Sequence, residues 1–139
     1  MKTKLVQPYL FFGGRCEEAL EFYRIALGAE LIMLMRYNQS PESIPSHRLP
    51  SGFETKVMHA SFSVGATTLM ASDGCEEGEK FDGFSLSVSL PTDAEAGRAF
   101  AALADGGIVT MPLMKTFWSP CFGMVTDRFG IGWMVSVEA

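Results

Sequence analysis

Few side chains in this sequence have the chemistry of a catalytic or metal-binding group. The histidines are His47 and His59, and three cysteines, Cys16, Cys75 and Cys121, are widely spaced without a CxxC pair. Two imidazoles are too few for a multi-histidine metal site, and the cysteine spacing favours neither a zinc ribbon nor a disulfide framework. We therefore expect free thiols and a cytoplasmic location, because a reducing compartment keeps thiols free.

His59 is the candidate general base, since imidazole is the side chain that exchanges protons most readily near neutral pH. It lies in the alternating segment 55–64 and shares one face with Ser61 and Ser63. No Asp or Glu stands at an obvious spacing to orient the ring. A histidine that only packs in a core or an interface remains the alternative.

Aromatic residues gather near the C-terminus, where Phe117, Trp118 and Trp133 could form a stacking wall for a planar ligand or simply pack in the core. Cys121 follows Pro120 and would act as a nucleophile only if its thiol pKa were lowered. No basic residue adjoins it in sequence.

Two similar halves of the chain must position these residues. Helices are predicted over 15–27 and 95–105, and strand patterns surround each of them in the same order. An offset of 78 pairs Glu17 with Glu95, Phe22 with Phe100, Ile25 with Leu103, Ala26 with Ala104, Gly28 with Gly106, and Met33 with Met111. The predicted fold is α+β, with two βαβββ modules forming a concave, barrel-like mixed sheet with helices outside. We expect a single domain over 1–139, with module 1 at about 4–73 and module 2 at about 82–139.

Composition supports a folded domain. The 139 residues are 47% hydrophobic and 19% charged, which argues against disorder. A net charge of −5 argues against nucleic acid or an anionic membrane as partner, and no apolar run reaches the roughly 18 residues of a membrane span. Segments 38–54 and 73–83 are predicted to be exposed loops because they are rich in proline or in acidic residues and glycine.

Three stretches resemble one protein family. TFWSPCFGMVTDRFGIGWMVSV (116–137) is the most specific, and residues 8–30 and 58–73 support it. They resemble the PhnB-like (YjdN-like) branch of the vicinal oxygen chelate superfamily, which includes glyoxalase I and bleomycin-resistance proteins. This branch is often labelled 3-demethylubiquinone-9 3-methyltransferase-like. The resemblance implies a homodimer and a small-molecule ligand held between modules.

The resemblance also implies where a metal would bind. In the superfamily's metal enzymes the ligands come from the first and last strands of each module, here at Gln7, Ser85, Met134, and either Leu69 or Met70. None of these is His, Asp or Glu, so we predict that the usual metal centre is absent and that no cofactor is bound. Methyl transfer is judged unlikely, because no glycine-rich cofactor-binding turn pattern is present.

The predicted site is a serine-rich, partly aromatic wall that suits a neutral or weakly polar organic molecule. Its candidates are His59 as catalytic residue and, as ligand-binding residues, Gln7, Tyr9, Ser85, Ser87, Trp118, Cys121 and Met134. Whether the protein is an enzyme stays open. The alternatives are a metal-dependent lyase or isomerase of glyoxalase type, with donors such as His59 or Glu54, and a drug-sequestering resistance protein.

Overall fold

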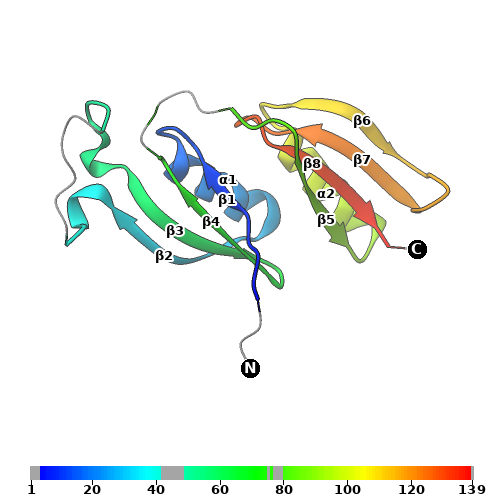
Figure 1. The fold of residues 1–139 in the computed structure, drawn as a ribbon. Helices are drawn as coiled ribbons and strands as arrows, with labels where there is room; N and C mark the ends of the chain where they lie inside the picture. The colour runs from blue at the N-terminus through cyan, green and yellow to red at the C-terminus, as the bar shows by residue number, and fades with distance from the viewer. Residues whose placement is uncertain (1–3, 42–48, 75, 77–79, 139) are drawn as a thin grey trace. The chain divides into compact units, whose positions relative to one another are not determined.

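The computed structural model describes residues 4–41, 49–74, 76 and 80–138. The chain divides into two compact units, Met1–Glu79 and Lys80–Ala139, and each contains one βαβββ module (Figure 1). Each module has a four-stranded mixed sheet and one helix. The predicted α+β class and the duplicated module are confirmed. No helix in the described ranges is long and apolar enough to cross a membrane.

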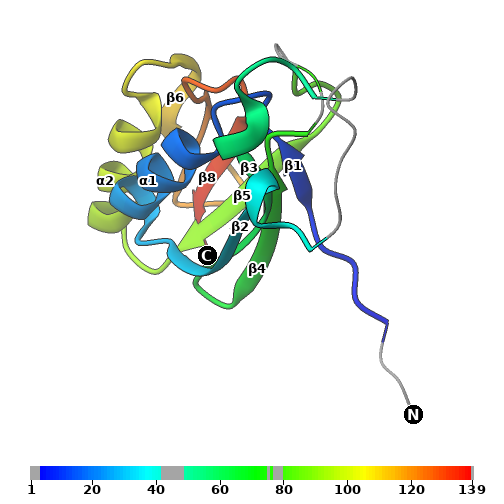
Figure 2. The ribbon, with the colours of Figure 1, turned by 90° about the vertical axis from the view of Figure 1, so that its left-hand side faces the viewer.

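The first unit forms one sheet with strand order β1-β4-β3-β2. The β1 and β4 strands are parallel, and the other neighbours are antiparallel. Helix α1 lies on one side of this sheet, and the described residues of this unit place no α-helix on the opposite side (Figure 2). The elements are β1 (Tyr9–Phe11), α1 (Cys16–Leu27), β2 (Glu30–Arg36), β3 (Val57–Val64) and β4 (Thr67–Ser72), with short 3-10 helices at Tyr37–Gln39 and Phe53–Thr55.

The second unit repeats this arrangement with strand order β5-β8-β7-β6. Here β5 and β8 are parallel, and helix α2 contacts all four strands. The elements are β5 (Ser85–Leu90), α2 (Asp93–Ala104), β6 (Ile108–Met114), β7 (Cys121–Thr126) and β8 (Gly132–Val137).

Both helices begin and end at residues suited to those positions. The Thr92 hydroxyl accepts a hydrogen bond from the Glu95 amide at 3.2 Å, so Thr92 is the N-cap of α2. Gly28 ends α1 with a left-handed φ of 68°, and Gly106 follows α2 with a φ of 77°. Glycine adopts this conformation without the Cβ clash that other residues meet.

Strand pairing confirms the repeat and sets its register. Tyr9 of β1 pairs with Met70, and Ser87 of β5, 78 positions after Tyr9, pairs with Met134. The fourth-strand position left open between Leu69 and Met70 is therefore Met70.

The helices do not follow the offset of 78. Both have twelve residues and start 77 positions apart, which matches buried Ala19 with buried Ala96 and buried Tyr23 with buried Phe100. The predicted pairings of Phe22 with Phe100 and of Ile25 with Leu103 were therefore wrong. Ile25 is 70% exposed while Leu103 is fully buried.

Some predictions about segments also need correction. The strand expected within 4–12 spans only Tyr9–Phe11, because Pro8 has no N–H to donate. Segment 38–54 is not wholly exposed, since the Phe53 side chain is buried against Gly14. Residues 42–48, with His47, and Cys75 lie outside the described residues.

Each unit buries one aspartate that collects backbone hydrogen bonds. Asp73 Oδ1 accepts from the Gly14 amide at 2.9 Å and the Cys16 amide at 2.7 Å, and Oδ2 accepts from the Val57 amide at 2.8 Å. Asp73 had been placed in an exposed acidic loop, and its 1% exposure corrects that prediction. It joins the start of α1 to the start of β3.

Asp127 performs the same role within one turn. Its Oδ1 accepts from the Phe129 and Ile131 amides, and its Oδ2 accepts from Trp133 Nε1 at 2.8 Å. The expectation that Asp127 caps local N–H groups is confirmed, and the bond to Trp133 adds a link to β8.

The edge strands β2 and β6 are irregular. A bulge in β2 leaves Ile32 unpaired between Leu31 and Met33, and the pairing of β6 with β7 shifts register around Pro112. Edge strands with bulges or proline resist further strand pairing. Both strands nevertheless expose apolar side chains, including Ile32 and Ile108.

Candidate functional site

The candidate site is the face of the first sheet that turns away from α1, called here the open face. Strand alternation divides β3 between its two faces: Ala60 and Phe62 are buried toward α1, while His59 and Ser61 are half-buried on the open face. This confirms the predicted alternation in β3. One row across the open face contains Tyr9, Met70, Ser61 and Met33.

A hydrogen-bonded pair marks the centre of this face. The Tyr9 hydroxyl lies 3.0 Å from His59 Nδ1, and the two ring centroids are 5.6 Å apart. The Phe11 ring lies 4.9 Å from Tyr9 and is partly exposed. The pair therefore stands beside an aromatic surface.

The geometry defines what the pair can do. Either Tyr9 donates its proton to Nδ1, which leaves Nε2 as an N–H donor, or Nδ1–H donates to the phenol oxygen, which leaves Nε2 as a proton acceptor. Within the described part of the chain, His59 Nε2 has no hydrogen-bond partner. A ligand hydroxyl could therefore bind Nε2 in either tautomer, whereas a carbonyl oxygen binds only the tautomer with Nε2–H.

The second sheet has a comparable open face with different side chains. Ser85, Ser87 and Ser89 alternate with the less exposed Leu86 and Val88. Ser87 pairs with Met134, and Ser89 lies across from Ser136. Three of the predicted ligand-binding residues, Ser85, Ser87 and Met134, thus share one face.

Trp118 and Cys121 lie on opposite sides of this sheet. Trp118 packs edge-to-face on Phe122 at 5.3 Å and on the almost fully exposed Phe117 at 4.7 Å. Cys121 alternates with Gly123, which contacts Phe100 of α2, so Cys121 belongs to the helix-covered side. Burial, and then the Asp93 carboxylate, raise the pKa of the Cys121 thiol, which disfavours the nucleophilic thiolate.

The positions that would hold a metal in this fold do not fit one. Ser85, Met70 and Met134 supply a hydroxyl and two thioethers, and Gln7 precedes β1 and supplies an amide. Hard divalent cations prefer carboxylates and other oxygen ligands, and borderline ones also bind imidazoles. Across residues 4–41, 49–74, 76 and 80–138, no three His, Cys, Asp or Glu side chains converge.

The glycine turn before α1 also does not fit a nucleotide-like cofactor. Such turns present free backbone N–H groups to the ligand at the helix start. Here the Gly14 and Cys16 amides already donate to Asp73. These two N–H groups are therefore not free to bind a phosphate group.

Comparison with known proteins defines the class. The sequence model of the 3-demethylubiquinone-9 3-methyltransferase family matches residues 4–136, and the chain belongs to this family. It is 35% identical to Protein YjdN of Escherichia coli strain K12 over 138 residues, covering 95% of this chain and 94% of YjdN.

Solved structures place this family in a wider fold group. Protein PA1353 from Pseudomonas aeruginosa has a TM-score of 0.84 at 43% identity, with 98% of each chain covered. The PhnB protein from Bacillus cereus has a TM-score of 0.80 at 29% identity, covering 97% of this chain and 100% of that one. A glyoxylase/bleomycin resistance protein/dioxygenase domain from Frankia sp. EAN1pec shares the fold at 13% identity, with a TM-score of 0.69 and full coverage of both chains.

Sequence reasoning placed Tyr9 and His59 on open faces but missed their contact. The two residues are 50 positions apart, and no local pattern joins them. The signal lay in pairing β1 beside β4, since β4 in turn pairs with β3. The buried role of Asp73 had no sequence signal beyond its place after a strand.

Proposed function

We propose that this chain binds a small, uncharged or weakly polar organic molecule on the open face of its first sheet. The hydrogen-bonded pair of Tyr9 and His59 is the observation that carries the proposal. A partly exposed aromatic ring, Phe11, lies beside this pair. The row of the sheet that contains Tyr9 adds Met70, Ser61 and Met33. Apolar lining with a few placed polar groups is typical of small-molecule sites.

The open face of the second sheet is a separate candidate surface that carries several of the predicted ligand contacts. Ser85, Ser87 and Met134 share this face, and Trp118 packs against Phe122 beside them. We propose these residues as contacts for a ligand on that face. We also propose His59 as the catalytic residue, and the product analysis described below tests this role.

Ligand binding is tested with a panel of neutral phenols and ketones, followed by thermal shift and by NMR of the His59 ring. We expect a binding compound to raise the melting temperature and to move the His59 resonances. His59→Gln and Tyr9→Phe should each weaken binding about tenfold, which corresponds to losing one buried hydrogen bond. Thr67→Ala, an exposed position on the same sheet, is the control.

Product analysis of the same mixtures separates the functional classes. A compound that binds and is converted identifies an enzyme, whereas a thermal shift without product identifies a binding protein. If no compound perturbs His59, or if Thr67→Ala weakens binding as much as His59→Gln does, the proposed site is wrong.

We further propose that ligand binding needs no metal ion, unlike the reactions of the metal enzymes that share this fold. The amide, hydroxyl and thioether groups at the expected ligand positions support it. Calorimetric titration with Mn²⁺, Ni²⁺ and Zn²⁺ should give no stoichiometric heat. Tight binding of one ion per chain would contradict the proposal and favour a metal-dependent lyase or isomerase.

We also propose a cytoplasmic homodimer. The free thiols of Cys16 and Cys121 suit a reducing compartment, and exposed apolar side chains such as Phe117 suit a protein interface. Light scattering should give twice the chain mass of 15.2 kDa, about 30 kDa. A mass of one chain would exclude the dimer.

A further inference from the structure

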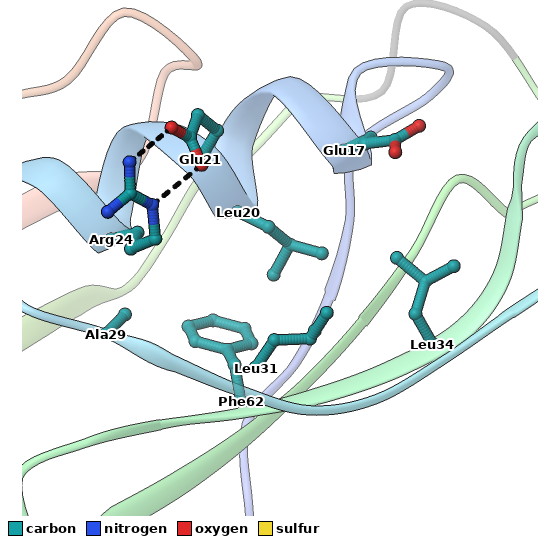
Figure 3. Close-up of a pocket in the computed structure, with 8 residues that line it drawn as sticks. All are labelled: Glu17, Leu20, Glu21, Arg24, Ala29, Leu31, Leu34 and Phe62. Atoms are coloured by element: carbon teal, nitrogen blue, oxygen red, sulfur yellow. Dashed lines mark hydrogen bonds and ion pairs between the residues drawn. The ribbon is translucent and has the colours of Figure 1, made fainter.

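A cavity lies on the side of the first sheet that faces α1, between α1 and the edge strand β2 (Figure 3). We call it the α1–β2 groove. Its volume is about 420 Å³. Leu31 and Leu34 of its floor pair with Phe62 and Ala60, which face α1, so the groove is separated from Tyr9 and His59 by the sheet. The groove is lined by Glu17, Leu20, Glu21, Arg24, Ala29, Leu31, Leu34 and Phe62.

The second unit differs from the first in how its helix contacts the sheet. With the helices aligned 77 positions apart, Leu20 of α1 corresponds to Gly97 of α2, and strand register matches Phe62 with Val125. In the second unit, α2 contacts β6 and the other three strands. In the first unit, the main strand contact of α1 is β3, and the larger Leu20 and Phe62 line the groove between α1 and β2.

The charged groups at the rim neutralise one another. Arg36 Nη2 lies 2.8 Å from Glu17 Oε2, and Arg24 Nη2 lies 2.6 Å from Glu21 Oε1. Hydrogen bonds from these arginines lower the pKa of Glu17 and of Glu21, so both carboxylates are ionised at neutral pH. Figure 3 shows the Glu21–Arg24 pair on the helix above the apolar side chains. A ligand therefore meets an apolar floor and a rim without net charge.

We propose that the α1–β2 groove is a second binding site, which takes an uncharged and mainly apolar small molecule. The volume falls within the roughly 300–1,000 Å³ typical of small-molecule sites. Five of its eight lining residues are apolar, and Leu31 at the mouth is 57% exposed, so a ligand that covers it removes apolar surface from water. A charged ligand would have to displace one of the existing ion pairs.

The probe for the test is N-phenyl-1-naphthylamine, a neutral dye whose fluorescence rises in apolar surroundings. We expect one dye per chain and intermolecular NMR contacts from the dye to the methyl groups of Leu20 and Leu34. Leu31→Gln should weaken binding about tenfold, because it replaces an apolar contact by an amide. Val109→Gln is the matched control, since Val109 is the repeat equivalent of Leu31 and is 46% exposed.

Three results would overturn the proposal. The first is no dye uptake, and the second is a loss of dye affinity in Val109→Gln equal to that in Leu31→Gln. The third is stronger binding of the anionic analogue 8-anilinonaphthalene-1-sulfonate. A loss in Tyr9→Phe but not in Leu31→Gln would place the dye on the open face instead. A change of molecular mass in Leu31→Gln would show that a second copy of the chain covers the groove.

Discussion

Replacing Asp73 by asparagine should destabilise the first unit strongly, because the buried carboxylate accepts three backbone hydrogen bonds. Asparagine can keep its oxygen toward the Gly14 and Cys16 amides, but its NH₂ group then faces the Val57 amide. A hydrogen bond to a charged group contributes about 1.5–3 kcal/mol, and a buried unpaired N–H carries a similar penalty. We expect Asp73→Asn to lower the free energy of unfolding by about 2–3 kcal/mol.

Asp73→Ala should lower it further, by about 4 kcal/mol, because all three amides lose their acceptor. Urea unfolding measures the total effect, and amide hydrogen exchange measures it locally. A loss of about 2 kcal/mol corresponds to roughly thirtyfold faster exchange at Val57, if the amide exchanges through unfolding of this unit.

Asp105→Asn is the control for charge loss. Its carboxylate lies 3.1 Å from Arg128 but the side chain is 77% exposed, so we expect a change within about 0.5 kcal/mol. The reasoning is refuted if Asp73→Asn stays within that same range and exchange at Val57 is unchanged.

Two further predictions concern the second unit. Gly123→Ala should destabilise it by about 1–3 kcal/mol, because the added Cβ would lie 2.8 Å from the Phe100 ring. Gly97→Ala, at an open position of α2, should instead stabilise it by up to about 1 kcal/mol. Urea denaturation of the two variants measures both changes in the free energy of unfolding. The raised thiol pKa of Cys121 predicts slow alkylation by iodoacetamide at pH 8 in the folded protein and faster alkylation in urea, measured on the Cys121 peptide by mass spectrometry. Equal rates in the two conditions would contradict the assignment of Cys121 to the covered side of the sheet.

Local patterns predicted much of the fold. The alternation of β3 and the serine face of β5 follow from the period of two in a strand, and Gly28 and Gly106 mark where helices end. The repeat offset predicted which strands correspond. It failed in the helices because the connections before and after α2 differ in length from those around α1.

The candidate site was predicted as a set of faces and not as contacts. The Tyr9–His59 bond depends on the order β1-β4-β3, which brings together residues of two strands that are far apart in sequence. The α1–β2 groove depends on how far α1 stands from β2, and Leu20 and Phe62 line the space between them. Sequence periodicity predicts neither the order of the strands in the sheet nor the distance between a helix and its sheet.

The edge strand β2 has a consequence for handling the protein. Between Glu30 and Arg36 it reads Leu-Ile-Met-Leu-Met, an uncharged apolar run of the kind that forms intermolecular β-structure when a chain is unfolded. In the folded unit the bulge at Ile32 opposes such pairing, but an unfolded chain has no bulge. Concentrated refolding should therefore produce aggregates through this segment, and Ile32→Lys should improve the refolding yield.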